Sequence, residues 1–196
     1  SILEGTNTFV IMPTGGGKSL CYQLPGIMLD GVAVIISPLI ALMKNQVDAV
    51  RNYANNDNIA HFFNSSLSKE ESEKVKKTAL SGNTKLLFVA PETISKEKNI
   101  IFFKKCNISF FAIDEAHCIS EWGHDFRTSY LRLGQNARKY CNTFSNDIPI
   151  LGLTGTASYD VLADVQRELE INDESAIVSP AKYARDELNF EIVDVG

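Results

Sequence analysis

The run 12–19 combines three consecutive glycines with a lysine and a serine, residue types that together can hold a phosphate group. It reads Met12-Pro13-Thr14-Gly15-Gly16-Gly17-Lys18-Ser19. Glycines let successive backbone N–H groups point at one anion, and Lys18 adds a full positive charge. The hydroxyl of Ser19 is placed to hold Mg²⁺. The run predicts a site for a nucleoside triphosphate, bound through Thr14, Gly15, Gly16, Gly17, Lys18 and Ser19.

The sequence around this run supplies the context that such a loop needs. The apolar segment Phe9–Ile11 precedes it as a strand, and Leu20–Leu24 follows it as the start of a helix. The alternative, a flexible glycine-rich turn with an incidental Lys-Ser pair, is disfavoured by these flanks. The usual pattern places a glycine where Met12 stands. The absence of this glycine points away from kinase-like and GTPase-like loops.

Two adjacent carboxylates follow a second apolar segment, Ile108–Ile113. Asp114 could contact a bound metal ion, and Glu115 could polarise an attacking water molecule. Taken alone, an Asp-Glu pair after a strand is equally typical of the acidic first turn of a helix. Combined with the phosphate loop, the pair favours a Mg²⁺-dependent nucleotide hydrolase.

Length and composition set broad limits on the chain. Its 196 residues suit one globular domain. The formal net charge of −5 argues against a broad basic surface that binds duplex DNA. The four cysteines show no C-x-x-C pairing, which favours reduced thiols. His117, Cys118 and His124 lack a second ligand pair at zinc-finger spacing. Because the chain begins with Ser1, we expect it to be a piece of a longer protein.

Alternating strand and helix patterns predict the fold. Nearly continuous apolar runs indicate strands at Val32–Ile36, Lys85–Val89, Ile108–Ile113 and Ile148–Leu153, with Ile59–Phe63 a weaker candidate. Helices are expected at Leu39–Val50 with Ser37-Pro38 at its start, from Ser68 to Leu80, and at Tyr159–Leu169. The tail from Asp173 reads as less regular, with an extended segment at Asn189–Val195. We expect a three-layer α/β/α sandwich with a mostly parallel sheet and ligands at the carboxyl ends of the strands.

Several motifs resemble those of the RecQ family of superfamily 2 DNA helicases. Asp114-Glu115-Ala116-His117 is similar to the DEAH form of motif II, and the segment 118–127 is similar to the family's aromatic-rich loop. Residues 12–25 resemble motif I, in which methionine at the position of Met12 is usual. Residues 37–43, 89–92 and 153–157 resemble motifs Ia, Ib and III. Residues 1–196 are thus identified as a first RecA-like ATP-binding domain, with cofactors ATP and Mg²⁺.

The resemblance implies a role for each matching residue. Lys18 would contact the β/γ phosphates, Ser19 and Asp114 would hold Mg²⁺, and Glu115 would be the general base. His117, Thr154 and Thr156 would relay the nucleotide state to the DNA site. Trp122, Phe126 and Arg127 would contact single-stranded DNA, in keeping with base stacking on aromatic rings. From the residues alone, Trp122 and Phe126 could instead be core side chains under an ordinary loop.

The resemblance also implies the partners and the setting. These are single-stranded or partly duplex DNA, and a second RecA-like domain that supplies arginines to the γ-phosphate. The function expected is that of an ATP-dependent 3′→5′ DNA helicase of repair and recombination. We expect it in the cytoplasm or the nucleus, without a membrane partner. Two alternatives stay open: a non-catalytic module that binds nucleotide and DNA, and an RNA helicase domain. A nucleotide kinase is disfavoured because it has no need of the Asp114-Glu115 pair.

Overall fold

The computed structural model describes residues 1–13, 15–94, 96–119, 148–155, 159–171 and 173–179 of the chain. Among these residues one seven-stranded sheet runs in the order β3-β4-β2-β5-β6-β1-β7. Each described pairing between neighbouring strands is parallel. The expected α/β class with a mostly parallel sheet is confirmed.

The strands are short and, apart from β7 at the edge, almost wholly buried, as parallel strands covered on both faces should be. They are β1 (Thr8–Ile11), β2 (Val32–Ile36), β3 (Ala60–Phe63), β4 (Leu86–Val89), β5 (Ile108–Ile113), β6 (Ile150–Thr154) and β7 (Ile177–Val178). The described helices are α1 (Leu20–Met28), α2 (Ile40–Ala54), α3 (Lys69–Leu80), α4 (Pro91–Ile94), α5 (Glu97–Phe103) and α8 (Tyr159–Leu169), with short 3₁₀ turns η1 (Ile2–Glu4), η2 (Ala116–Ile119) and η3 (Glu174–Ala176). Within these ranges each helix is too short or too polar to span a lipid bilayer.

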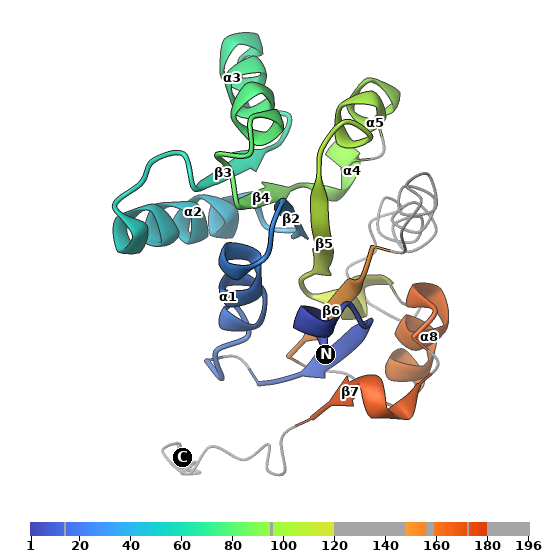
Figure 1. Ribbon diagram of the computed structural model, residues 1–196. Coiled ribbons are helices and arrows are strands. Elements are labelled where there is room, and N and C mark those ends of the chain that lie inside the picture. The colour runs from blue at the N-terminus through green and yellow to red at the C-terminus, as the bar shows by residue number, and fades with distance from the viewer. Residues whose placement is uncertain (14, 95, 120–147, 156–158, 172, 180–196) are drawn as a thin grey trace, which may run out of the picture.

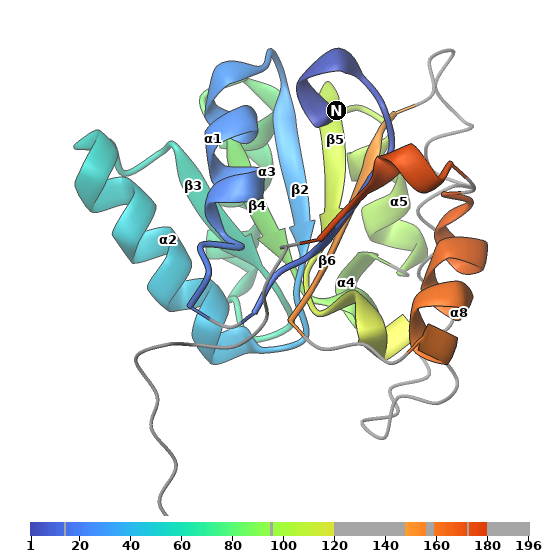
Figure 2. The same cartoon turned by 90° about the horizontal axis from the view of Figure 1, so that it is seen from below.

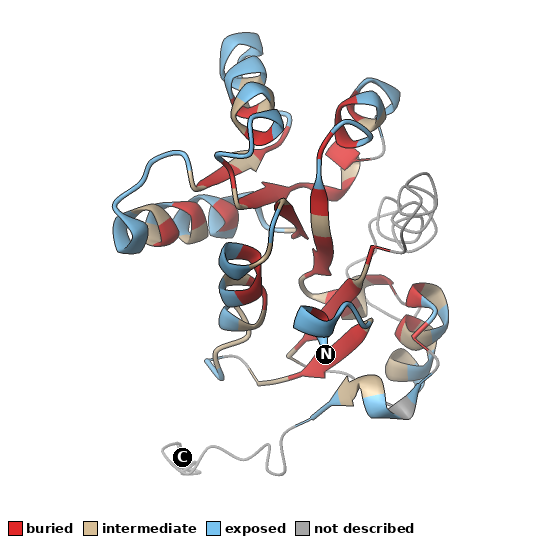
Figure 3. Ribbon diagram, viewed as in Figure 1, coloured by how far each residue is buried: buried red, intermediate tan, exposed pale blue. Residues whose placement is uncertain are grey.

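Helices cover both faces of the sheet and give the three layers (Figures 1 and 2). Apolar residues of α1 and α2, among them Tyr22 and Met43, form one core cluster with alternate strand residues. Residues of α3, α5 and α8, among them Val75 and Phe103, form a second cluster with the other strand residues. Figure 3 shows the buried sheet between helices whose outer sides are exposed.

Local sequence signals place several elements correctly. Helix α3 begins with the expected capping box: the Ser68 hydroxyl accepts from the Glu71 N–H at 3.2 Å, and the Glu71 carboxylate accepts from the Ser68 N–H at 2.8 Å. Strands β2 and β5 have the expected bounds, and the weaker candidate at 59–63 is β3. These are segments whose hydrophobic pattern or cap is unambiguous.

The start of α2 differs from the expected one. Ser37-Pro38 does not cap the helix, because the N-cap is Leu39 and the helix begins at Ile40. The Ser37 N–H donates instead to the Val89 carbonyl at 3.2 Å, which extends the sheet hydrogen bonding one residue beyond β2. Tertiary pairing thus overrides the local cap signal. The tail also holds a short strand, β7, paired with β1, while the segment 189–195 lies outside the described residues.

Candidate nucleotide-binding and catalytic site

Strands β1, β5 and β6 are neighbours in the sheet and all end at one edge, which brings three sequence-distant segments together. The glycine-rich loop leaves β1 after Ile11, Asp114 follows Ile113 at the end of β5, and Thr154 is the last residue of β6. The Met12 N–H donates to the Thr154 carbonyl at 2.9 Å, so the loop starts directly beside β6. The expected placement of candidate residues at the carboxyl edge is found for each of these segments.

The loop uses glycine where its backbone takes left-handed conformations. Gly15 has φ of 83° and Gly17 has φ of 89°, values that side chains with a Cβ rarely adopt. The N–H groups of Gly17, Lys18 and Ser19 donate to no acceptor within the described ranges. A helical turn then forms from Ser19, whose carbonyl accepts from the Gln23 N–H at 2.9 Å. Free N–H groups before a helix are suited to an anion.

Met12, which departs from the usual loop pattern, packs against Gly16. A Cβ added at Gly16 would lie 2.7 Å from Met12 Cγ, 3.3 Å from its sulfur and 2.9 Å from the Pro13 carbonyl oxygen. Gly16 also donates its N–H to that carbonyl at 2.9 Å. The methionine side chain therefore fills space that a side chain at position 16 would need. This contact gives a physical reason for the pairing of Met12 with Gly16.

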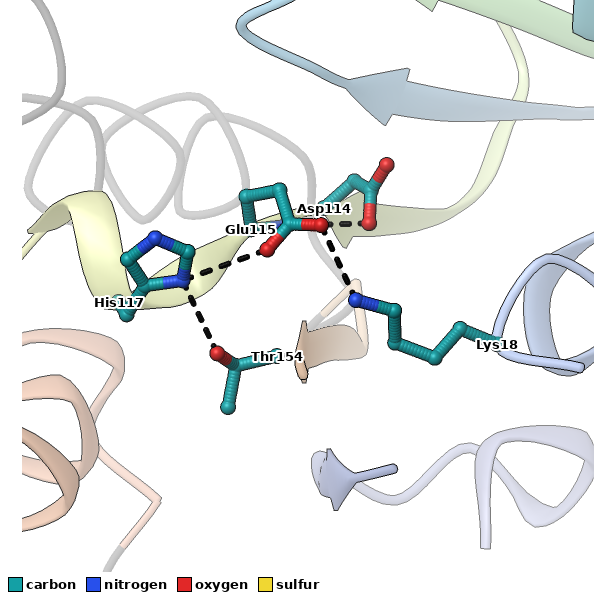
Figure 4. A network of polar contacts seen from close by, with 5 residues as sticks. All are labelled: Lys18, Asp114, Glu115, His117 and Thr154. Atoms are coloured by element: carbon teal, nitrogen blue, oxygen red, sulfur yellow. Dashed lines mark hydrogen bonds and ion pairs between the residues drawn. The ribbon is translucent and has the colours of Figure 1, made fainter. Parts of the chain in front are cut away.

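Lys18 reaches across the sheet edge to Glu115. Its Nζ lies 3.0 Å from Glu115 Oε1, and the two side chains are 13% and 29% exposed. Figure 4 shows the pair at the centre of a network that also includes Asp114, His117 and Thr154. The cation of the loop and the candidate base of the second motif are thus in direct contact.

Glu115 has an unusual backbone conformation, with φ of +52°. A non-glycine residue in this region is uncommon, and such residues concentrate where the surrounding structure holds them in place. Here the Glu115 N–H donates to Asp114 Oδ1 at 3.1 Å, and its carbonyl accepts from the Cys118 N–H at 2.9 Å. The Asp114 N–H donates to the Ile36 carbonyl at 2.9 Å. The turn is therefore fixed from both sides.

Asp114 is held in an environment that disfavours its negative charge. Burial raises the pKa of its carboxyl group, and the charge of Glu115 raises it further, while Lys18 and the Glu115 N–H act in the opposite direction. Burial, followed by the charge of Asp114, also raises the pKa of Tyr22 far above its ordinary value. A cation bound beside Asp114 would relieve this cost.

His117 connects Glu115 to the end of β6. Its Nδ1 lies 3.0 Å from Thr154 Oγ1 and 3.3 Å from Glu115 Oε2. A carboxylate can only accept, so the contact is attractive when Nδ1 carries a proton. Glu115, His117 and Thr154 thus form a chain from the site to strand β6 (Figure 4).

The residues present fit ATP and Mg²⁺. The glycine loop offers N–H groups without described acceptors and one lysine, which match a polyphosphate. Asp114 offers a partly buried carboxylate whose charge is not fully compensated, and Ser19 offers a hydroxyl, both of which are hard oxygen ligands. No group of three or more His, Cys, Asp or Glu suited to a metal ion occurs within the described ranges.

Some candidate residues lie outside the described residues. They are Thr14 of the loop, the expected DNA contacts Trp122, Phe126 and Arg127, and Thr156 of the third motif. His124 is also outside them. The structure brings together Lys18, Asp114, Glu115, His117 and Thr154, and it tests no contact of the others.

Sequence reasoning missed Tyr22 as part of the site. Tyr22 is 3% exposed, and its ring meets Phe88 edge-on at 6.0 Å between centroids. It lies in the first turn of α1, three residues after Ser19. Its position after the Lys-Ser pair was available in the sequence, but only the fold brings it close enough to Asp114 to shift its pKa.

Comparison with known proteins settles the family. The DEAD/DEAH box helicase family matches residues 1–165. This chain belongs to the DEAD/DEAH box helicase family. Within it, the expected resemblance to RecQ proteins is confirmed by sequence identity.

Two curated DEAD/DEAH box relatives illustrate this resemblance. The ATP-dependent DNA helicase RecQ of Haemophilus influenzae is 43% identical over 171 residues, which is 87% of this chain and 26% of that protein. The probable ATP-dependent DNA helicase RecS of Bacillus subtilis is 45% identical over 171 residues, 87% of this chain and 33% of that protein. The chain therefore spans about a quarter to a third of the length of these relatives.

Solved structures of other helicases share the fold at low sequence identity. The helicase Lhr of Mycobacterium smegmatis bound to ssDNA and AMP-PNP matches with a TM-score of 0.69 and 20% identity, over 91% of this chain and 24% of that one. The DUF1998 helicase MrfA bound to DNA and AMPPNP matches with a TM-score of 0.70 and 17% identity, over 93% of this chain and 26% of that one. The DEAD/DEAH box domain thus has the architecture of helicase motor domains.

Proposed function

We propose that this chain is the first RecA-like motor domain of an ATP-dependent 3′→5′ DNA helicase of the RecQ type. The observation that carries the proposal is the convergence of Lys18, Glu115, His117 and Thr154 in one connected network beside Asp114. Such a network links a phosphate-binding loop to a strand end in the way that a nucleotide-driven motor requires. The identity to RecQ and RecS over 171 residues supports DNA as the substrate.

The loop residues bind the nucleotide in this proposal. The backbone of residues 14–19 surrounds the phosphates, and Lys18 leaves Glu115 to contact the β/γ groups. Ser19 and Asp114 hold Mg²⁺, which would polarise the γ-phosphate and neutralise developing charge. Glu115, released from Lys18, accepts a proton from the attacking water and acts as the general base.

Coupling to DNA runs through His117 in this proposal. Its Nδ1 contacts both Glu115 and Thr154. A movement of the Glu115 carboxylate therefore changes the contact with Thr154, and a movement of strand β6 changes the contact with Glu115. Thr156, two residues later in the sequence, would take part in the same relay. Trp122, Phe126 and Arg127 bind the single strand by stacking and phosphate attraction.

The proposed motor needs a second RecA-like domain of the same protein. Arginines from that domain would stabilise charge on the γ-phosphate, an effect worth roughly 10³–10⁵ in rate for related hydrolases. A RecA-like domain without that partner domain would therefore turn over ATP slowly. The protein would act where DNA is found, in the cytoplasm or the nucleus.

DNA-stimulated ATP hydrolysis tests the proposal. The full-length protein is assayed with single-stranded DNA and with RNA of the same sequence, beside its Lys18→Ala variant. We expect DNA to stimulate turnover more strongly than RNA, and Lys18→Ala to remove turnover. Equal stimulation by RNA would favour an RNA helicase domain, and turnover that survives in Lys18→Ala would overturn the assignment of the site.

A further inference from the structure

Helices α3 and α5 enclose a groove on the outer side of the domain, on the face drawn at the top of Figure 1. The groove has a volume of about 520 Å³. We call it the α3–α5 groove and define it by Lys76, Lys77, Leu80, Lys98, Ile101 and Lys105. Leu80 and Lys105 precede the amino ends of β4 and β5, whereas the nucleotide loop lies at the carboxyl edge. The groove is therefore separate from the proposed ATP site.

The floor of the α3–α5 groove is apolar. Phe102 lies at its base and packs on Phe63 with ring centroids 5.7 Å apart. Above it, Leu80 is 47% exposed and Ile101 is 61% exposed. Exposed aliphatic side chains above an aromatic floor offer a binding place for another apolar side chain.

The walls of the groove are basic. Lys76 is paired with Glu73 at 2.9 Å, and its Nζ lies 5.9 Å from the centre of the Phe63 ring. The side chains of Lys77, Lys98 and Lys105 form no hydrogen bond or ion pair within the described ranges. The segment 69–105 carries nine lysines and five glutamates, a net charge of +4 in a chain of net charge −5. The segment that forms the groove is thus more basic than the chain as a whole, and four of its lysines line the groove.

We propose that the α3–α5 groove binds an acidic segment of a partner protein that inserts a bulky aliphatic side chain between Leu80 and Ile101. The three unpaired lysines match carboxylates, and the apolar floor matches the aliphatic anchor. Nucleic acid fits less well, because phosphates would be satisfied by the lysines but no group of a nucleotide needs the exposed aliphatic side chains of Leu80 and Ile101. An apolar centre with a polar rim is typical of protein interfaces.

A defined peptide tests this proposal on the intact protein. The probe is a fluorescent, end-blocked peptide of aspartates around a central pair of leucines, and binding is followed by anisotropy at moderate salt. We expect saturable binding that weakens when serines replace the leucines. We also expect an excess of single-stranded oligonucleotide to compete poorly.

Variants locate the binding. Lys105→Glu should weaken peptide binding several-fold, whereas Lys104→Glu, an equal charge change beside the groove, should alter it less than twofold. Ile101→Asp should weaken binding by a similar factor, and Ile101→Val should preserve it. ATP binding, measured in parallel, should stay unchanged in all four.

Three results would overturn the proposal. They are equal binding of the leucine and serine peptides, equal losses in Lys104→Glu and the groove variants, and displacement of the peptide by oligonucleotide at similar concentration. The last would assign the groove to nucleic acid.

Discussion

Lys18 Nζ and Glu115 Oε1 lie 3.0 Å apart although 97 residues separate them in sequence. The same lysine is the cation of the glycine-rich loop and the same carboxylate is the proposed general base. In this arrangement each neutralises the other, so nucleotide phosphates must displace Glu115 from Lys18 before either can act. ATP binding and release of the base are therefore one event in our account.

Replacing Glu115 with glutamine should separate binding from hydrolysis. Glu115→Gln removes the competing charge, so ATP should bind up to about fivefold more tightly, since a partly exposed ion pair is worth up to ~1 kcal/mol. Hydrolysis should fall by about 10²–10⁴ because the general base is lost. Binding of a fluorescent non-hydrolysable analogue and steady-state turnover measure the two effects. Weaker nucleotide binding in this variant would contradict the competition.

Gly16→Ala should damage the loop through the Met12 contact. The added Cβ would lie 2.7 Å from Met12 Cγ and 2.9 Å from the Pro13 oxygen, and overpacking of this kind costs about 1–3 kcal/mol. We expect nucleotide affinity to fall along with the unfolding midpoint in urea. The control is Gly82→Ala, where φ is +76° but no atom lies within 4 Å. It should lower stability and leave nucleotide affinity intact; an equal loss of affinity in both variants would refute a role for the contact.

Thr154→Val should weaken coupling more than catalysis. Valine keeps the shape but removes the hydroxyl that lies 3.0 Å from His117 Nδ1, a loss of about 1 kcal/mol. ATP turnover without DNA should change little, while stimulation by single-stranded DNA should fall several-fold. Thr8→Val is the matched control, since it removes a buried strand hydroxyl that donates to the Thr6 carbonyl at 3.1 Å. If both variants kept full stimulation, His117 and Thr154 would have no part in coupling.

The free energy of unfolding should fall in mild acid because His61 is harder to protonate in the folded chain than in the unfolded one. Burial, then the charges of Arg51 and Lys74, lowers the pKa of His61 to about 4 from 6.5. The unfolded chain takes up this proton below about pH 6.5 and the folded chain only below about pH 4, so the contribution to stability is lost as pH falls across this window. Urea unfolding at pH 7 and pH 5 should show a smaller difference in His61→Leu than in the parent. An identical pH difference in both would rule out His61 as the source.

The sequence was sufficient to predict those helices and strands whose signal lies in neighbouring residues. Continuous apolar runs fixed the bounds of β2 and β5, and the capping box at Ser68 fixed the start of α3. The expected parallel sheet follows because strands buried on both faces alternate with helices. It also follows from this alternation that the glycine loop and Asp114 lie at one edge.

The remainder depends on contacts between distant residues. Ser37 looks like a helix cap, but its N–H pairs with Val89 across the sheet. The two residues of β7 are too few to give a pattern, and β1 stabilises them by pairing. The ion pair of Lys18 with Glu115 and the left-handed turn at Glu115 likewise arise from the fold. Motif spacing predicts which residues belong to the site but not how they contact one another.

The most direct test of the central claim is strand displacement by the full-length protein on duplexes with a 3′ or a 5′ single-stranded tail. We predict ATP-dependent unwinding of the 3′-tailed duplex alone, and its loss in Glu115→Gln although that variant still binds ATP. Unwinding by Glu115→Gln at the parent rate, or robust DNA-stimulated ATP turnover without displacement of either strand, would contradict the account.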